Sequence, residues 1–178
     1  MKPFDRTSII LHWLVAAGLL GMIPFGIWLA YLESGPDKTA LVQIHKSFGV
    51  LVGTAAVLRI AWHIKAGVPA QANAHSRWER QLARFVQIGL LSFSVALPLS
   101  GIVKSITYAR PVQVFGYPLI PKLIVEKNTT MNELATLSHS AFAWCLAGLI
   151  ALHVAGALKH HLIDRDDTSR RMLRAGRQ

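Results

Sequence analysis

Long segments without a formal charge constrain the fold of this chain more than any other feature. Three of them cover Ile9 to Leu32, Phe85 to Val103 and Leu134 to Leu158, with lengths of 24, 19 and 25 residues. An α-helix needs about 20 apolar residues to cross a hydrocarbon core about 30 Å thick. Each segment therefore predicts one membrane-spanning helix.

A fourth span is predicted from Leu41 to Ile64, although two charges interrupt it. Lys46 and Arg59 bracket an uncharged core of twelve residues. Both charges lie near the ends of the span, where long side chains reach the membrane interface. The composition agrees, because 52% hydrophobic and 16% charged residues do not fit a water-soluble globule.

We therefore predict an all-α membrane protein, a single four-transmembrane-helix bundle over residues 1–178 with spans at about 8–32, 41–64, 82–104 and 134–161. The first apolar segment exceeds the 7–15 residues of a secretory signal, so it is kept as a span. The longest connector, Lys104 to Glu133, is expected to form an ordered outer loop that could include a short helix over the bundle mouth.

The distribution of basic residues orients this bundle. With four spans and a cytoplasmic N-terminus, 13 of the 19 lysines and arginines fall on the inner side. The positive-inside rule then predicts that both termini are cytoplasmic. Although the formal net charge is +10, no aromatic-interleaved basic motif accompanies it, so the charge does not indicate nucleic-acid binding.

Two histidines in the last span, His139 and His153, give the clearest functional signal. They are fourteen residues apart, a spacing that advances about 21 Å along an α-helix and ends about 40° short of four full turns. Both imidazoles would therefore point from nearly the same face, at two depths of the membrane. Such a helix carries two ligands and needs two partners elsewhere.

The depth of each histidine in the membrane predicts which histidines are those partners. His12 lies at the inner start of the first span, so it pairs with His153. His45 lies near the outer start of the second span, so it pairs with His139. Each pair draws on two helices, as bis-imidazole coordination of a haem between helices requires. The single cysteine, Cys145, excludes a C-x-x-C-H attachment site, so any haem must be bound noncovalently.

Two simpler interpretations remain open for such histidines. One is a haem-free structural protein, because a lone membrane histidine often only hydrogen-bonds a neighbouring helix. The other is a metal-ion transporter, although no Asp or Glu lies in the core of any span to balance a cation. Four histidines at two matched depths favour a cofactor, since ionisable residues in membrane spans are costly and usually functional.

Arg59 repeats, on the second predicted span, the spacing found between His139 and His153. It follows His45 by fourteen residues and so shares its helix face, at the depth of the inner pair. A haem propionate is the predicted anionic partner of this guanidinium. An interfacial arginine at lipid headgroups is the alternative.

Several motifs, in order, resemble the bacterial cytochrome b561 family over nearly the whole chain. They are Ile10-Leu-His-Trp13, His45-Lys-Ser-Phe-Gly49, Leu58-Arg59, Ala96-Leu-Pro-Leu-Ser-Gly101, Phe115-Gly116, Ser138-His139, Leu152 to His161 and Asp166 to Leu173. The resemblance implies a multi-pass protein of the bacterial inner membrane with two haem b groups. It also implies that the axial ligands are His12, His45, His139 and His153.

The resemblance further implies electron transfer from a periplasmic donor to ubiquinone near the cytoplasmic side. Some relatives oxidise superoxide, which would make the chain a superoxide:ubiquinone oxidoreductase-type enzyme. His160 falls where the family approaches quinone, and Asp164 and Asp166 could relay protons there; the alternative is an interfacial histidine. No residue is assigned as catalytic.

Two further points follow from the resemblance. The family is also similar to the cytochrome b subunits of membrane hydrogenases, so a haem-binding anchor subunit of a partner oxidoreductase is the alternative function. If superoxide is the donor, the outer residues Lys104, Arg110, Lys122 and Lys127 would attract the anion. Some relatives have histidines where this chain has Arg84 and Gln87, which leaves the inner quinone contacts open.

Overall fold

The computed structural model describes residues 5–67, 76–166 and 172, and four long helices dominate it. They are α1 (Arg6–Tyr31), α2 (Pro36–Ala66), α3 (Arg77–Thr107) and α4 (Thr129–Lys159). All four are long and apolar enough to cross a membrane. The prediction of an all-α membrane bundle with four spans is therefore confirmed.

The helices begin earlier than the hydropathy pattern predicts, because capping residues fix their starts. Asp5 caps α1, Ser76 caps α3 and Asn128 caps α4, each accepting a backbone N–H bond from the first turn. Pro36 occupies the first turn of α2, where its missing N–H costs nothing. Hydropathy reports the part of a helix that contacts lipid, so the polar first turns were not included in the predicted spans.

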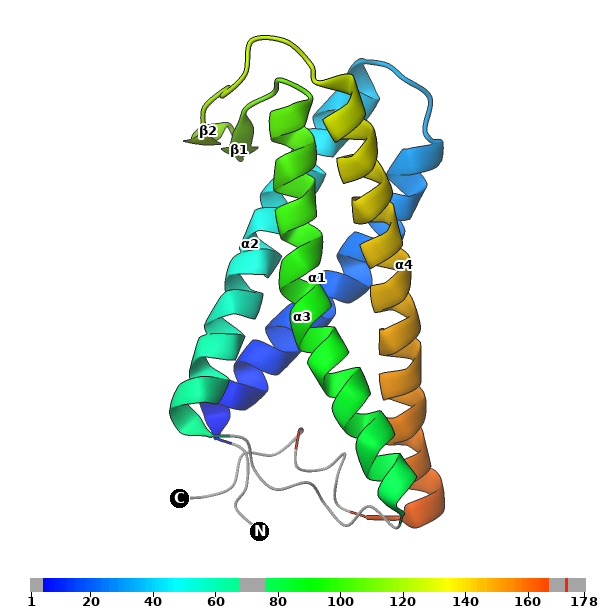
Figure 1. Ribbon diagram of the computed structural model, residues 1–178. Helices are drawn as coiled ribbons and strands as arrows, with labels where there is room; N and C mark the ends of the chain where they lie inside the picture. Colours follow the sequence, from blue (N-terminus) through cyan, green and yellow to red (C-terminus); the bar gives the residue numbers. More distant parts are fainter. Residues whose placement is uncertain (1–4, 68–75, 167–171, 173–178) are drawn as a thin grey trace.

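The helices alternate in direction along the bundle (Figure 1). We call the end where α1 begins and α4 ends the lower end, and the opposite end the upper end. α4 continues at the lower end as one π-helical turn, η1 (His160–Asp164). The predicted last span, 134–161, therefore ends within this turn.

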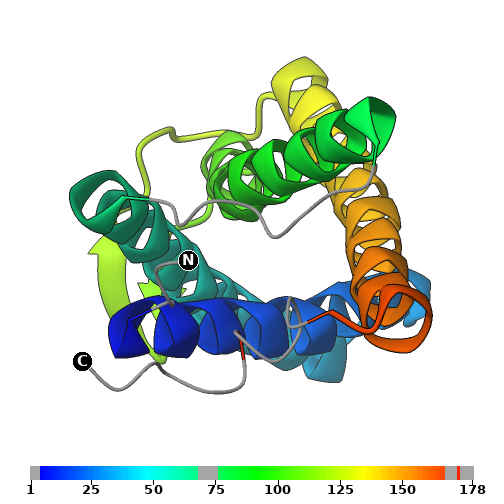
Figure 2. The ribbon, with the colours of Figure 1, turned by 90° about the horizontal axis from the view of Figure 1, so that it is seen from below.

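The four helices form a ring in chain order when the bundle is seen from below (Figure 2). α1 packs on α2, α2 on α3 and α3 on α4, whereas α1 and α4 make few close backbone contacts. Buried residues from all four helices meet in one apolar core: Val15, Leu19, Ile23, Ala55, Ala56, Leu97 and Leu146. Leu146 has no exposed surface, and it lies seven residues from both His139 and His153.

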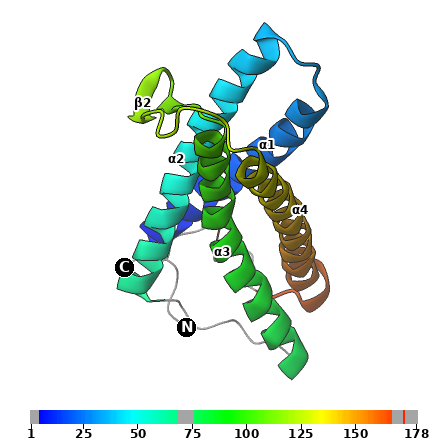
Figure 3. The same ribbon diagram turned by 45° about the horizontal axis from the view of Figure 1, so that its top comes forward.

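The upper connector contains a β-hairpin and not the short helix considered from the sequence. Strands β1 (Val112–Val114) and β2 (Tyr117–Ile120) pair antiparallel beside the upper end of α3 (Figures 1 and 3). Phe115 and Gly116 form the turn, both with positive φ, which favours a tight hairpin over a helix. The Phe115 N–H donates to the Ser47 hydroxyl at 2.9 Å and so fastens the hairpin to α2.

Asp5 provides a test of the lower end of the bundle. It accepts hydrogen bonds from the Ser8 hydroxyl at 2.7 Å, the Ser8 N–H at 2.9 Å and the Trp62 indole at 3.0 Å. These bonds, the Ser8 hydroxyl first, hold the pKa of Asp5 below its usual value of 3.8. Asp5→Ala is expected to cost about 1 kcal/mol, lowering the thermal midpoint in detergent by about 2–4 °C at pH 7.

The sign of the pH dependence follows from the lowered pKa. The charged form stabilises the fold above the unfolded value near 3.8, and this contribution disappears as the pH falls through the lower folded value. Asp5→Asn keeps a capping side chain without the charge, so the stability of this variant should lose only its dependence on acid pH. Identical melting of the wild type and Asp5→Ala at pH 7 would contradict the capping role.

Candidate functional site

The lower histidine pair joins the beginning of α1 to the end of α4. His12 and His153 face each other with ring centroids 6.2 Å apart and ring planes at 58°. Trp13 lies against His12, with ring centroids 5.3 Å apart. α1 and α4, which have few backbone contacts, thus meet through these two imidazoles at the lower end.

The upper pair joins α2 to α4. His45 and His139 lie with ring centroids 6.4 Å apart and ring planes at 82°. Phe25 packs against His45, with centroids 5.6 Å apart. A Cβ built on Gly26 would lie only 2.8 Å from Cε1 of His45, so α1 leaves room for this ring by means of a glycine.

The centroid separations match the dimensions of a metal held between two imidazoles. A metal–nitrogen bond is about 2.0 Å, and an imidazole nitrogen lies about 1.2 Å from its ring centre, so two rings on opposite sides of one ion have centroids about 6.4 Å apart. Both pairs lie within 0.2 Å of this value, at 6.2 and 6.4 Å. Direct stacking of two imidazoles, or a direct hydrogen bond between them, would not require the same centroid separation in both pairs. Each pair can therefore accept one metal ion, as in a bis-histidine haem.

His139 is also held in a defined tautomer. The Ser100 hydroxyl donates to the Leu97 carbonyl at 2.7 Å, and His139 Nδ1 lies 2.9 Å from Ser100 Oγ and 3.2 Å from the Leu97 oxygen. A carbonyl only accepts, so Nδ1 of His139 carries the proton. The lone pair of Nε2 is then free to bind a metal.

Arg59 lies beside the lower pair, at the depth that the sequence predicts. Its charge acts on His12, His153 and His63, and its Nε atom is buried without a hydrogen-bond partner in the described residues. A buried N–H group without a partner is costly, so an anionic group at this position would stabilise the Arg59 guanidinium. A haem propionate has the required chemistry.

A second cation, Lys104, lies beside the upper pair. It belongs to the last turn of α3 and not to the outer loop, and its charge acts on both His45 and His139. Lys38 and Lys46 are close enough to Lys104 to interact with it, and Arg110 interacts with Lys46. Several basic residues are therefore grouped near the upper pair.

His160 lies at the lower end in η1, within a charged cluster. Its Nδ1 is 2.8 Å from Asp166 and 3.2 Å from Asp164. Lys159 bridges Asp164 at 2.8 Å and Glu79 of α3 at 3.1 Å, which ties the end of α4 to the start of α3. The ligand atoms of His160, Asp164 and Asp166 lie within 4.8 Å of one another, so they could share a proton or a cation.

The sequence did not place three residues beside the histidines: Ser100 and Gly26, which were given no role, and Lys104, which was expected only as an outer cation. A signal existed for Gly26, because it follows His12 by fourteen residues and therefore lies on the same face of α1 at the upper depth. No comparable signal marks Ser100 or Lys104, since Ser100 hydrogen-bonds a histidine of another helix and the charge of Lys104 acts on histidines of other helices. Such contacts depend on how the helices are rotated in the bundle.

Comparison with known proteins shows which family this chain resembles. A family model described as prokaryotic cytochrome b561 matches residues 3–175. Cytochrome b561 homolog 2 of Escherichia coli K12 is 32% identical over 175 residues, covering 97% of this chain and 92% of the relative. Homolog 1 of the same organism is 26% identical over 97% of this chain and 98% of its own length. A probable superoxide oxidase CybB of Yersinia pestis is 26% identical over 97% and 96%.

Proposed function

The chain belongs to the prokaryotic cytochrome b561 family, and from this premise we propose that it transfers electrons across the bacterial inner membrane through two b-type haems. The proposed direction is from a periplasmic donor to ubiquinone near the cytoplasmic side. When bound, the haems supply one-electron redox chemistry. The observation that carries the proposal is the spacing of both histidine pairs, 6.2 and 6.4 Å between centroids.

The proposed ligands are the paired histidines. His12 and His153 hold the lower haem, and His45 and His139 hold the upper one. Arg59 binds a propionate of the lower haem, which its buried and unpartnered Nε atom supports. Lys104 has the same role at the upper haem, supported by its electrostatic contact with His45 and His139.

The lower end is the proposed cytoplasmic end, because most basic residues of the sequence then lie inside. His160 lies at this end and is the proposed quinone contact. Its hydrogen-bonded neighbour Asp166 supports a role in proton delivery, since reduction of a quinone consumes protons. The upper end then faces the periplasm.

Superoxide is the proposed donor, because a relative covering nearly the whole chain is named a probable superoxide oxidase. Two superoxide anions would each lose one electron to give O₂. The two electrons and two protons convert one ubiquinone to ubiquinol. The group of basic residues near the upper pair supports an anionic donor on this side.

A reduced-minus-oxidised absorption spectrum of the purified protein is the first test. Bands of b-type haem in freshly isolated protein are expected, and their absence would overturn the proposal. The second test adds superoxide and ubiquinone to the purified chain alone. Ubiquinol formation supports the enzyme, whereas a haem-loaded but inactive chain indicates an anchor subunit that needs a partner oxidoreductase.

Neutralising the upper cations should slow the reaction with superoxide. The variant carries Lys46→Gln, Arg110→Gln and Lys122→Gln, and its rate constant should fall roughly tenfold at low ionic strength, because steering by surface charge contributes about 10- to 1,000-fold. The difference should shrink as salt screens the charges. Stopped-flow measurement of haem reduction over a salt series checks this.

A matched control carries the same change in charge at the lower end: Arg6→Gln, Lys65→Gln and Arg77→Gln. It should keep the wild-type rate and salt dependence, since these side chains lie far from the proposed donor side. Haem content is measured in both variants to exclude loss of cofactor. An upper variant with wild-type salt dependence would contradict the steering role.

A further inference from the structure

The two histidine pairs differ in the support behind their rings. His139 in the upper pair has hydrogen-bond partners at Nδ1, Ser100 and the Leu97 carbonyl. His12 in the lower pair has a buried Nδ1 without a partner in the described residues, and His45 is in the same situation. Of these three histidines, His139 is the one with a hydrogen bond behind its ring in the described residues.

The nearby charges do not distinguish the upper pair from the lower pair. Arg59 acts on both histidines of the lower pair, and Lys104 acts on both histidines of the upper pair. Each pair thus has one positive charge that would favour the reduced state of an iron held there. The hydrogen bond behind His139 has no counterpart at His12.

Ser100 is built to hold the ring of His139. Its hydroxyl proton is already donated to the Leu97 carbonyl at 2.7 Å, so its oxygen can only accept from His139 Nδ1–H. The adjacent Gly101 lies against the same ring, because a Cβ there would be 3.2 Å from Cε1 of His139. The Ser100-Gly101 pair of α3 therefore fixes both the tautomer and the position of the imidazole.

We propose that Ser100 is a positioning residue that lowers the reduction potential of the upper haem relative to the lower one. This inference rests on the proposed function, since it takes His139 as an axial ligand. A hydrogen bond accepted from Nδ1–H makes the imidazole a more basic ligand, which stabilises oxidised iron. The resulting difference in potential favours electron movement from the upper to the lower haem.

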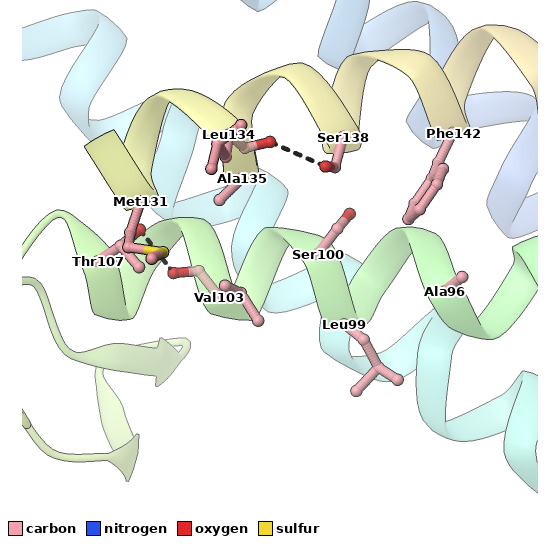
Figure 4. Close-up of a pocket in the computed structure, with 10 residues that line it drawn as sticks. All are labelled: Ala96, Leu99, Ser100, Val103, Thr107, Met131, Leu134, Ala135, Ser138 and Phe142. Atoms are coloured by element: carbon pink, nitrogen blue, oxygen red, sulfur yellow. Dashed lines mark hydrogen bonds between the residues drawn. The ribbon is translucent and has the colours of Figure 1, made fainter. Parts of the chain in front are cut away.

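The surroundings of Ser100 allow a test with a conservative variant and a matched control. Ser100 lines a lipid-facing groove of about 470 Å³ between α3 and α4, together with Leu99, Val103 and Ser138 (Figure 4). This space can take the extra methyl group of Ser100→Thr, which keeps the hydroxyl. Ser94 on the same helix offers a matched control, because it is buried and donates to Leu91 O at 2.8 Å but has no hydrogen bond to a histidine in the described residues.

The experiment is a redox titration of the purified, haem-loaded protein and its variants, with both midpoint potentials recorded. Ser100→Ala should raise one midpoint, shifting its oxidised-to-reduced equilibrium about threefold to tenfold, or about 28–59 mV for one electron. The low-spin ferric EPR signal of the same haem should also change. Ser100→Thr should restore both values, and Ser94→Ala should move neither.

Each possible result of this experiment either supports or overturns the inference about Ser100. Unchanged potentials in Ser100→Ala, with both haems present, would overturn the inference while leaving the proposed function intact. Equal shifts in Ser94→Ala would overturn it as well, because they would indicate a general effect of losing a buried hydroxyl. Loss of one haem from Ser100→Ala, with retention in Ser100→Thr, would support the positioning role. Wild-type protein without haem would overturn the proposed function itself.

Discussion

Purified His139→Ala protein is expected to contain about half the haem of the wild type, because one of two bis-histidine sites would lose an axial ligand. His153→Ala should deplete the other haem, so the two variants should lack different components of the redox titration. Replacing both histidines should leave almost none. The pyridine haemochrome assay, expressed per mole of protein, measures this directly.

The control for these variants is His160→Ala. His160 lies seven residues beyond His153 on the same chain segment, but it contacts Asp164 and Asp166 and belongs to neither pair. It should therefore retain two haems even if quinone reduction falls. Equal haem content in wild type and His139→Ala would contradict the ligand assignment, and so would loss of the same component from both single variants.

Gly26→Ala should remove the upper haem without changing any ligand. The new Cβ would lie 2.8 Å from Cε1 of His45, closer than atoms can pack, so the ring must leave its present position opposite His139. A displaced ligand of this kind should cut occupancy of the upper site to a small fraction. Haem quantitation and the redox titration should show loss of the same component as in His139→Ala.

The matched control is Gly21→Ala on the same helix. A Cβ at Gly21 meets nothing within 4 Å, so this change should keep both haems. It should also slightly stabilise α1, since alanine is about 1 kcal/mol more favourable than glycine within a helix. Full haem content in Gly26→Ala would show that His45 does not need its present position.

The histidine pairs could be predicted from the sequence because helical geometry converts spacing directly into face and depth. Fourteen residues between His139 and His153 gave two sites on one helix, and the alternation of spans gave each a partner. The structure brings the same partners together. This conversion of spacing into helix face and depth needs the geometry of only one helix at a time.

Contacts that depend on the relative rotation of helices could not be predicted in this way. Ser100 and Gly101 face His139 only because α3 turns this side towards α4, and no period within α3 records that rotation. Lys104 was read as a loop residue, since hydropathy ends before the helix does. The β-hairpin was missed although Phe115-Gly116 is a turn signal, since an ordered outer loop that could include a short helix was expected there instead.

The apolar layer around Leu146 has a consequence for energetics. It lies midway between the two pairs, which are about 21 Å apart along α4, and a charge crossing it crosses most of a 30 Å hydrocarbon core. On the proposed direction, each electron moves inward against an inside-negative membrane potential. A full elementary charge costs about 2.3 kcal/mol per 100 mV, so passage across about 21 of the 30 Å costs about 1.6 kcal/mol per 100 mV. Electron transfer through this protein should therefore be electrogenic, and it should slow as vesicles carrying it become more strongly polarised.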